Sequence, residues 1–499
     1  MHSRFRVVAA AFVALPTVAL SQRELTPAEQ VSHAVARLTF GARPGDLARV
    51  SAIGVDKWIE QQLRPESISD RDAEHALRGL TPWWGDGTDE RKLATVYYSS
   101  FKDASGMMRM TRVPQSEQFG AGKIIRAQLS ERQLLEVITD FWENHFSVYA
   151  GKMPSAGALF VWNRSVIRPR ALGKFRDLLG AVAKSPAMLY YLDNYESTRF
   201  GINENYAREL LELHTLGVDG GYTQDDVINV ARALTGWTFD PRLTLPVRVE
   251  NIETKFVFRR HWHDTSEKTV LGHVLPAGGG IDDGERVLDI VASHPSTAKF
   301  IALKLARRFV SDTPPAALVE RAAMVFTCTD GDIAEVVRTI VTSDEFFARA
   351  AFRAKVKTPF EFIVSAKRAL NAPADTTPTS VRALRELGQP LFGKDTPEGW
   401  PDYADAWMSS GAMLKRVMLA SDASDGKLNY MPVSLWRGWM PLSGLAPEQQ
   451  ADGVVQYLLG GTVYPATLKT LRAAEGENGR DRLREMIAIA LGSPEFQRR

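Results

Sequence analysis

The sequence contains only one cysteine, Cys328, in 499 residues. A single cysteine excludes an intramolecular disulfide, a thiolate metal cluster and a covalently attached c-type haem. The chain also lacks an excess of charge of one sign, because 61 Lys and Arg residues are balanced by 59 Asp and Glu residues, a net charge of +2. Nothing in this balance indicates a polyanionic partner. We therefore expect no nucleic acid among the partners.

The common catalytic motifs are missing as well. The sequence has no H-E-x-x-H, no Glu-x-x-His pair in a helical segment and no G-x-S-x-G. Their absence argues against zincin proteases, ferritin-like di-iron bundles and hydrolases with a nucleophile elbow. Neither a Walker loop nor a G-x-G-x-x-G after a strand occurs, so a nucleotide cofactor has no support. Any chemistry must therefore come from scattered polar residues.

The first residues have the composition of a secretion signal. Arg4 and Arg6 precede an apolar run from Val7 to Leu20, and small residues follow it. This order predicts a signal peptide at 1–21, cleaved before Gln22. The run is shorter than the ~20 apolar residues of a spanning helix, so we expect no stable membrane anchor. The expected destination is the periplasm or the outside of the cell.

Helical periodicity dominates the rest of the chain and predicts a mainly α fold, a large multi-helix globular protein. Because about 480 residues exceed the usual size of a single core, we expect two helical lobes, at 22–276 and 277–499. β-branched and aromatic residues gather in short runs at about 243–275. These runs predict a small excursion that resembles a β-hairpin.

Several helices can be placed from their end signals and apolar stripes. The residues Thr-Pro-Ala-Glu at 26–29 form a capping-box pattern, which predicts the start of a helix. An apolar stripe predicts a helix over 131–146, and a similar pattern predicts one over 203–216. Thr223 is the expected N-cap of a further helix over 224–235.

One pattern occurs twice in the second lobe, at about 315–347 and at 465–497. Each copy consists of a helical pattern, a polar turn, a second helical pattern and the tetrapeptide S-x-E-F. The residues shared at a constant offset are Pro315, Ala316, Leu318, Glu335, Ser343, Glu345 and Phe346, matching Pro465, Ala466, Leu468, Glu485, Ser493, Glu495 and Phe496. The pattern predicts a duplicated helical hairpin.

Five blocks, in this order, resemble a known bacterial family. They are RLTFGARPGD (37–46), ITDFWENHFSVY (138–149), NENYARELLELHTLGVDGGYT (203–223), HDTSEKTVLG (263–272) and LGQPLFGKDTPEGW (387–400). The sequence is similar in these blocks to the exported family catalogued as domain of unknown function 1800. The resemblance implies an exported bacterial protein, and it implies as partner a co-encoded exported protein of another uncharacterised family. It implies no catalytic residue.

Three polar residues stand in apolar surroundings on two of the predicted helices. His145 falls within the apolar stripe of 131–146, and His214 falls within that of 203–216, where Glu209 lies at the apolar edge. Such groups must be paired, because burying a polar group alone is costly. They are either core residues bonded to backbone atoms or functional groups. On the second interpretation, Glu209, His214 and His145 are candidate catalytic residues.

A further candidate group consists of His261, His263 and Asp264. In an extended segment alternate residues point to the same side, so both histidines would face one metal ion, with Asp264 as a third ligand or as an orienting partner. A polar turn in which Asp264 caps the next element explains the same residues. Together with His145, Glu209 and His214, the group has the composition of a site for Zn²⁺, Fe²⁺ or Mn²⁺. The candidate cofactor is therefore a divalent transition metal, provided that these side chains converge.

Two functions remain open on the sequence. The first is an exported protein with a buried His/Glu/Asp site that acts in metal-dependent hydrolysis or oxidation. The second is a non-catalytic scaffold or binding protein of the cell envelope. Trp83 and Trp84, in a predicted loop, extend the second function to carbohydrate binding, because their rings could stack on sugars.

Overall fold

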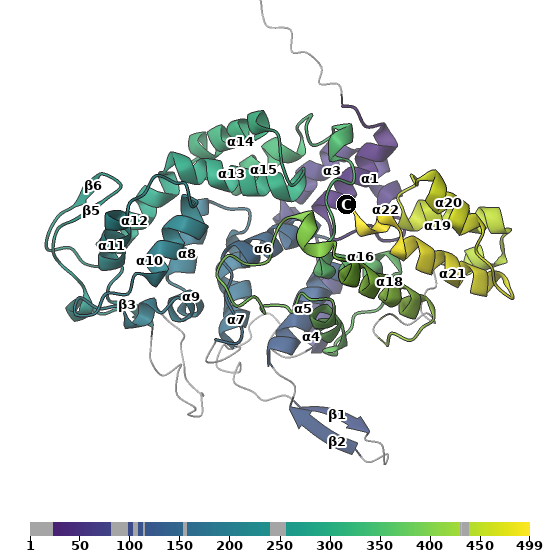
Figure 1. Cartoon of the computed structure of the whole chain (residues 1–499), viewed down its shortest axis with the longest axis horizontal. Coiled ribbons are helices and arrows are strands. Elements are labelled where there is room, and N and C mark those ends of the chain that lie inside the picture. The colour runs from purple at the N-terminus through teal and green to yellow at the C-terminus, as the bar shows by residue number, and fades with distance from the viewer. Residues whose placement is uncertain are drawn as a thin grey trace, which may run out of the picture.

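The computed structural model of the protein describes residues 23–80, 98–102, 108–112, 115–152, 157–239, 256–429, 431 and 439–499. These residues are mainly helical, with a few short strands (Figure 1). The predicted mainly α fold is therefore confirmed. The predicted signal peptide at 1–21 and the pair Trp83 and Trp84 lie outside the described residues.

The first half of the described chain contains short and medium helices, two of them π-helical. They are α1 (Pro27–Leu38), α2 (Asp46–Ile53), α3 (Val55–Gln62), η1 (Pro65–Ser67), α4 (Arg71–Leu80), α5 (Gln115–Leu129), α6 (Gln133–His145), α7 (Gly157–Val161), π-helical η3 (Trp162–Ile167), η4 (Arg168–Arg170), α8 (Phe175–Ala183), α9 (Pro186–Tyr191), η5 (Asn194–Glu196), α10 (Asn205–Glu209), π-helical η6 (Leu210–Thr215) and α11 (Gln224–Ala233).

The second half continues with helices and 3₁₀ turns. They are η8 (Arg260–Trp262), α12 (Ile281–Ser293), α13 (Pro295–Phe309), α14 (Ala316–Cys328), α15 (Ile333–Val341), η9 (Arg349–Ala351), α16 (Pro359–Ala369), α17 (Thr379–Glu386), η10 (Ala404–Trp407), α18 (Ser410–Ser424), η12 (Met440–Gly444), α19 (Pro447–Leu458), α20 (Pro465–Arg472), α21 (Gly479–Gly492) and α22 (Pro494–Gln497).

The strands form two-stranded antiparallel pairs. The pairs are β1 (Tyr98–Lys102) with β2 (Met108–Arg112), β3 (Trp237–Phe239) with β4 (Phe256–Phe258), and β5 (Lys268–Val270) with β6 (His273–Leu275). A two-residue turn joins β5 and β6, and both of its residues, Leu271 and Gly272, have positive φ. Such turns match the twist of the flanking strands. The small β excursion predicted at about 243–275 is thus present in its described part, from residue 256 onward.

Local sequence signals set the two predicted helix starts. Thr26 accepts a hydrogen bond from the Glu29 N–H group while the Glu29 carboxylate accepts from the Thr26 backbone, which completes the predicted capping box of α1. Thr223 caps α11 in the same reciprocal way with Asp226. Each cap satisfies backbone N–H groups that have no partner within the helix.

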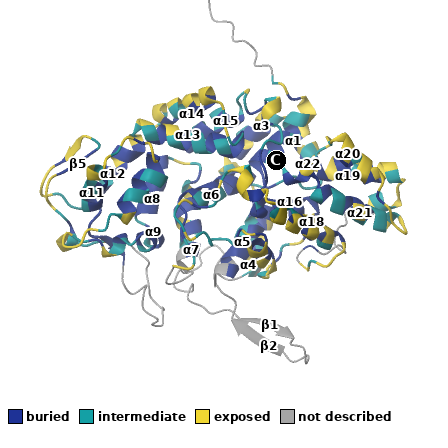
Figure 2. Ribbon diagram, in the orientation of Figure 1, coloured by how far each residue is buried: buried dark blue, intermediate teal, exposed yellow. Residues whose placement is uncertain are grey.

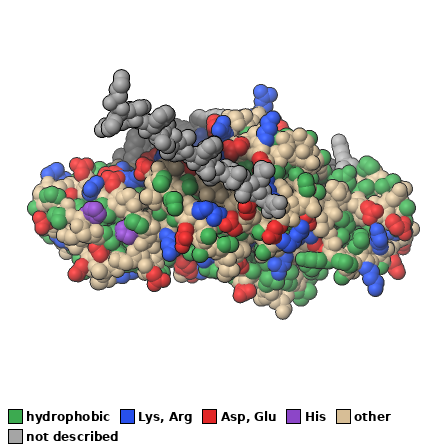
Figure 3. Space-filling view, turned by 90° about the horizontal axis from the view of Figure 1, so that it is seen from above, with side chains coloured by type: hydrophobic (Ala, Val, Ile, Leu, Met, Phe, Trp, Pro, Cys, Tyr) green, Lys and Arg blue, Asp and Glu red, His purple; other side chains and the backbone are tan. Residues whose placement is uncertain are grey.

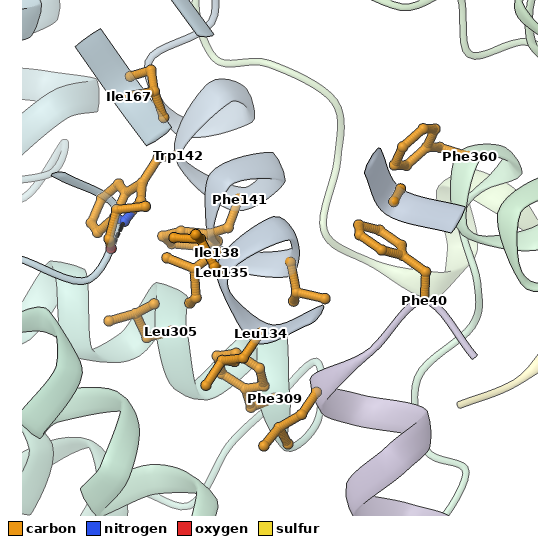
Figure 4. Close-up of a cluster of buried hydrophobic side chains, with 14 of the residues drawn as sticks. Phe40, Leu134, Leu135, Ile138, Phe141, Trp142, Ile167, Leu305, Phe309 and Phe360 are labelled. Carbon is orange, nitrogen blue, oxygen red and sulfur yellow. Dashed lines mark hydrogen bonds between the residues drawn. The ribbon is translucent and has the colours of Figure 1, made fainter. Parts of the chain in front are cut away.

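Helix α6 lies near the middle of the molecule and is buried along most of its length (Figures 1 and 2). Its apolar stripe packs against α13, and the Trp142 indole donates a hydrogen bond to the Ala171 carbonyl oxygen at 2.9 Å (Figure 4). Phe40, after α1, meets Phe360 of α16 edge to face at 5.3 Å between ring centroids. One contiguous hydrophobic cluster joins these helices.

The predicted lobes at 22–276 and 277–499 both contribute to this cluster, which extends from Leu25 to Phe496. The boundary between them remains a prediction. Helix pairs occupy both copies of the predicted hairpin, α14 with α15 and α20 with α21. In each S-x-E-F tetrapeptide, the serine hydroxyl accepts a hydrogen bond from the backbone N–H group of the phenylalanine three residues later, which is buried. The repeated residues therefore make the same local turn twice.

None of the described helices is long and apolar enough to cross a membrane. On the face shown in Figure 3, basic and acidic side chains are interspersed over the described surface.

Candidate functional site

Two of the predicted catalytic residues come together at the C-terminal end of α6. His145 ends this helix, and His214 lies in η6. The His145 Nε2–H group donates to the backbone carbonyl oxygen of His214 at 3.1 Å, and the ring centroids are 6.3 Å apart. Both rings are buried beside Phe146. Within the described structure, His145 Nδ1 and both ring nitrogens of His214 have no hydrogen-bond partner.

Burial keeps both imidazoles neutral. It lowers the pKa of His145 well below the usual value and that of His214 to about 3, and the positive charge of Lys304 acts in the same direction. A general acid or base works best when its pKa is near the working pH. Because these pKa values lie far below 7, the pair suits hydrogen-bond acceptance better than proton transfer.

Glu209 is placed with a different group. Half-burial raises the pKa of its carboxyl group, and the carboxylates of Glu212 and Glu398 raise it further, while Arg208 opposes them. Arg208 also pairs with Glu204, at 3.1 Å, as the four-residue spacing on a helix allows. Glu209 thus lies near two other acidic residues, Glu212 and Glu398.

The helix predicted over 203–216 changes type after Glu209. In η6 the Leu216 N–H group donates to the carbonyl oxygen of Leu211, five residues earlier, at 2.9 Å. Such π-helical turns are rare and are found frequently at functional sites. The wider turn rotates the later side chains away from their α-helical positions. Thr215 is buried there, and its hydroxyl donates to the Leu210 carbonyl oxygen at 2.6 Å.

The predicted metal ligands His261, His263 and Asp264 do not share one side of an extended segment. His261 lies in the 3₁₀ turn η8 and is exposed, whereas His263 follows the turn and is fully buried. The tight turn breaks the alternation that the prediction assumed. Asp264 faces Arg232, with 2.8 Å between carboxylate and Nε. Partial burial opposes ionisation of Asp264, but hydrogen bonds from Arg232 and Ser266 hold the pKa of its carboxyl group below the usual value.

His263 belongs instead to a buried ion-pair network. Its Nδ1 lies 2.9 Å from the Thr235 carbonyl oxygen, and its Nε2 lies 3.1 Å from an Asp283 carboxylate oxygen. The Lys268 ammonium group donates to the same carboxylate oxygen at 2.7 Å. Both ring nitrogens of His263 are therefore engaged. In the part of the chain that the structure describes, no three His, Cys, Asp or Glu side chains are grouped so that they could hold a metal ion.

A cleft lies beside the His145–His214 pair, between α6, α13, the start of α16 and the segment 389–402. We call it the central cleft. Its walls carry the charged groups Lys123, Asp140, Glu143, Arg308, Lys394 and Asp402, the amides Asn144 and Gln389, and the rings Phe141, Phe360, Phe392 and Trp400. The predicted site residues are not in its wall, although His145 directly follows Asn144.

Ion pairs hold the polar groups at one end of the central cleft. The Lys123 ammonium group lies 2.7 Å from both the Asp140 and the Glu143 carboxylates. Asn163, in the π-helical η3, donates to the other Glu143 oxygen at 2.6 Å. Burial alone would lower the pKa of Lys123, but the two carboxylates raise it above the usual value. These groups are paired and fixed in position.

The side chains of Lys304 and Asp402 have no close ion-pair partner among the described residues. Lys304 lies one helical turn before Arg308 on α13, and no described carboxylate lies within 4.0 Å of its ammonium group. Burial lowers the pKa of Lys304, while Asp402 opposes that effect. The Asp402 backbone carbonyl oxygen accepts from Lys355 at 2.7 Å, which anchors this residue at the cleft. Lys304, which is not part of the cleft wall, thus lacks a close counter-ion among the described residues.

Asn144 ties the segment 389–402 to α6. Its amide donates to the Trp400 carbonyl oxygen at 2.8 Å and accepts from the Trp400 N–H group at 2.7 Å. The preceding Gly399 has φ +75°, and a Cβ atom there would lie 2.2 Å from the Asn144 carbonyl oxygen. Glycine is therefore required twice over, by the left-handed backbone and by the close approach.

We expect Gly399→Ala to lower the free energy of unfolding by about 2–4 kcal/mol, because backbone strain and a steric clash combine. Gly388 offers a matched control, since its φ is +89° but nothing lies within 4 Å of an added Cβ. Gly388→Ala should lose only about 1 kcal/mol, from the left-handed backbone alone. Urea denaturation measures both values. Equal losses would show that the contact with Asn144 does not constrain this segment.

The sequence did carry a signal for the central cleft. The blocks at 138–149 and 387–400 supply most of its wall, including Asn144 and Trp400. The predicted site residues did not include Asn144 or Trp400. A side-chain amide that bonds to a distant backbone has no characteristic spacing in the sequence.

A family model described as "Protein of unknown function (DUF1800)" matches residues 33–498. The chain belongs to this family. The match confirms the resemblance drawn from the five blocks. The matched range includes all residues of the central cleft wall. Comparisons with the curated proteins and with the solved structures gave no match.

Proposed function

We propose that this DUF1800 protein binds a sugar, or another small polyhydroxylated ligand, in the central cleft. The composition of the cleft wall carries the proposal: carboxylates, amides and cationic groups stand among the rings of Phe392 and Trp400. Each hydroxyl group both donates and accepts hydrogen bonds, so a ligand rich in hydroxyls can use groups of both kinds. The rings offer apolar surface to the C–H faces of such a ligand.

The rigidity of the cleft wall supports the same ligand class. Lys123, Asp140 and Glu143 are already held by one another before any ligand arrives. Such preorganisation reduces the entropic cost of binding.

A binding function is preferred over the metal-dependent hydrolysis or oxidation considered from the sequence. The described residues contain no group of ligands suited to a metal, and the pKa of His214, about 3, does not suit proton transfer at neutral pH. Delivery by the predicted signal peptide at 1–21 would place the cleft among envelope polysaccharides. A co-encoded exported protein would be a partner in the same compartment.

Trp400→Ala should weaken binding of a responsive oligosaccharide about tenfold or more, since it removes apolar stacking surface. The side chain can be removed without losing the bonds to Asn144, because those bonds use the Trp400 backbone. The measurement is isothermal titration of the full chain with a panel of neutral and acidic oligosaccharides.

Trp262→Ala is the matched control, because Trp262 lies in η8, outside the cleft wall, beside Arg259. It should bind like the wild type. The proposal fails if no oligosaccharide of the panel binds, or if the two variants weaken binding equally.

A further inference from the structure

A second cavity lies on the other side of α16, against α1, α19 and α22. We call it the α16 cavity. It does not share its wall with the central cleft, and the inference drawn from it is independent of the proposed sugar binding. Rings form much of its apolar surface, among them Phe40, Phe352 and Phe496. A ligand with an apolar body fits such a wall.

The polar side of the α16 cavity carries Lys357, which is 8% exposed. Its ammonium group donates to the Ser365 hydroxyl at 3.0 Å and lies 3.8 Å from the centroid of the Phe496 ring. No described carboxylate lies within 4.0 Å of it. Burial lowers the pKa of Lys357 to about 7, and Arg499 adds to the effect while Glu361 opposes it. This is a buried cation without a close counter-ion.

The carboxylates of the cavity wall are already engaged. Glu361 pairs with Arg308 at 2.7 Å and with Arg499 at 3.0 Å. Glu495 accepts hydrogen bonds from the Tyr464 N–H group at 2.6 Å and from the Thr467 hydroxyl at 3.1 Å. Neither is free to neutralise Lys357.

Positive charge is therefore in excess around the cavity. Arg499 is 5% exposed, and its Nη1 atom has no hydrogen-bond partner among the described residues. Burial lowers the pKa of Arg499 to about 10, and the nearby guanidinium of Arg308 contributes. Glu361 is shared between Arg308 and Arg499, so one carboxylate faces two buried guanidinium groups, and an anion entering the cavity would be favoured.

We propose that the α16 cavity binds an organic carboxylate, whose anionic group pairs with Lys357 and Arg499 and whose apolar body packs against Phe40 and Phe496. The polar and apolar walls of one cavity distinguish this ligand from an inorganic anion, which would leave the rings unused.

The test is titration of the full chain with hexanoate, in which calorimetry and thermal unfolding measure the binding. Hexanoate should bind saturably and raise the Tm, whereas 1-hexanol, which lacks the charge, and inorganic phosphate, which lacks the apolar body, should do so at least about tenfold more weakly. Equal binding of hexanol would overturn the role of the charge. Binding of phosphate in preference to hexanoate would overturn the assignment to a carboxylate.

The variant Lys357→Met separates a binding lysine from a structural one. It should weaken hexanoate binding at least about tenfold while the ligand-free Tm stays equal or rises, because a buried charge has been removed. Lys367→Met is the control: Lys367 is a buried lysine in α16, outside the cavity wall, and its loss should leave hexanoate binding unchanged.

A measurement on the wild type keeps the test independent of how the variants fold. At pH 8 binding of hexanoate should be accompanied by proton uptake, seen as a dependence of the binding heat on the ionisation enthalpy of the buffer, because the carboxylate favours the charged form of Lys357. Binding without proton uptake, or a Lys357→Met variant that folds and binds like the wild type, would contradict the proposal.

Discussion

The Glu361→Gln variant is expected to lose about 3–5 kcal/mol of its free energy of unfolding, because it leaves two buried guanidinium groups without their carboxylate. Glu361 is 3% exposed and pairs with both Arg308 and Arg499. Its second oxygen accepts from the Thr358 N–H group at 2.9 Å. Burial opposes ionisation, but the two arginines hold the pKa of Glu361 at about 2. Glutamine keeps the shape and removes only the charge.

Urea denaturation at pH 7 measures this loss. Glu345→Gln is the matched control, because Glu345 pairs with Arg321 at the surface, where such pairs contribute about 0–1 kcal/mol. The two variants should therefore differ by at least about 2 kcal/mol. A Glu361→Gln variant as stable as the control would mean that the arginines do not depend on this carboxylate.

The buried His214 is expected to make the protein sensitive to mild acid. Its pKa is about 3 in the folded protein and about 6.5 in an unfolded chain. The unfolded chain therefore takes up the proton first, so stability falls as the pH falls through 6.5 and continues to fall until about pH 3. Between pH 7 and pH 4 this one side chain should account for about 3 kcal/mol. His145, whose pKa is lowered for the same reason, adds to the loss.

The comparison that isolates this contribution is a series of urea unfolding curves from pH 7 to pH 4 for the wild type and for His214→Leu. The free energy of unfolding of the variant should change less between pH 7 and pH 4 than that of the wild type, by about 3 kcal/mol. His75→Leu removes an exposed histidine and should follow the wild type. Parallel curves for wild type and His214→Leu would show that His214 is not buried in the neutral form.

The fold was predictable wherever it depends on neighbours in the sequence. The capping boxes at Thr26 and Thr223 join residues three positions apart, and the stripe of 131–146 follows the helical period, so α1, α6 and α11 were foreseen. The π-helical turn at Leu210–Thr215 was not foreseen, because an α-helical wheel assumes one period throughout. The 3₁₀ turn over 260–262 was likewise not foreseen, because the residues around His261 and His263 were predicted to be extended.

The candidate site was only partly predictable. The burial of His145 and His214 followed from their place in apolar stripes, and both are buried. Their contact with each other joins α6 to η6 and has no sequence signal. The Asp140 and Glu143 carboxylates of the same helix pair with Lys123 of α5, and no local sequence signal predicts this pairing. A charged face is solvated or internally paired according to what packs against it.

The sequence by itself determined the helical class, the helix starts at Thr26 and Thr223 and membership of the DUF1800 family, because periodicity, caps and motif blocks are local properties. Only the tertiary structure decided which polar residues form a site. Asn144 meets Trp400, and Lys357 faces a cavity lined by Arg499, across long stretches of chain. Such contacts depend on how whole helices pack, and that packing places the paired charges inside the molecule and leaves Lys304 and Lys357 without close counter-ions among the described residues.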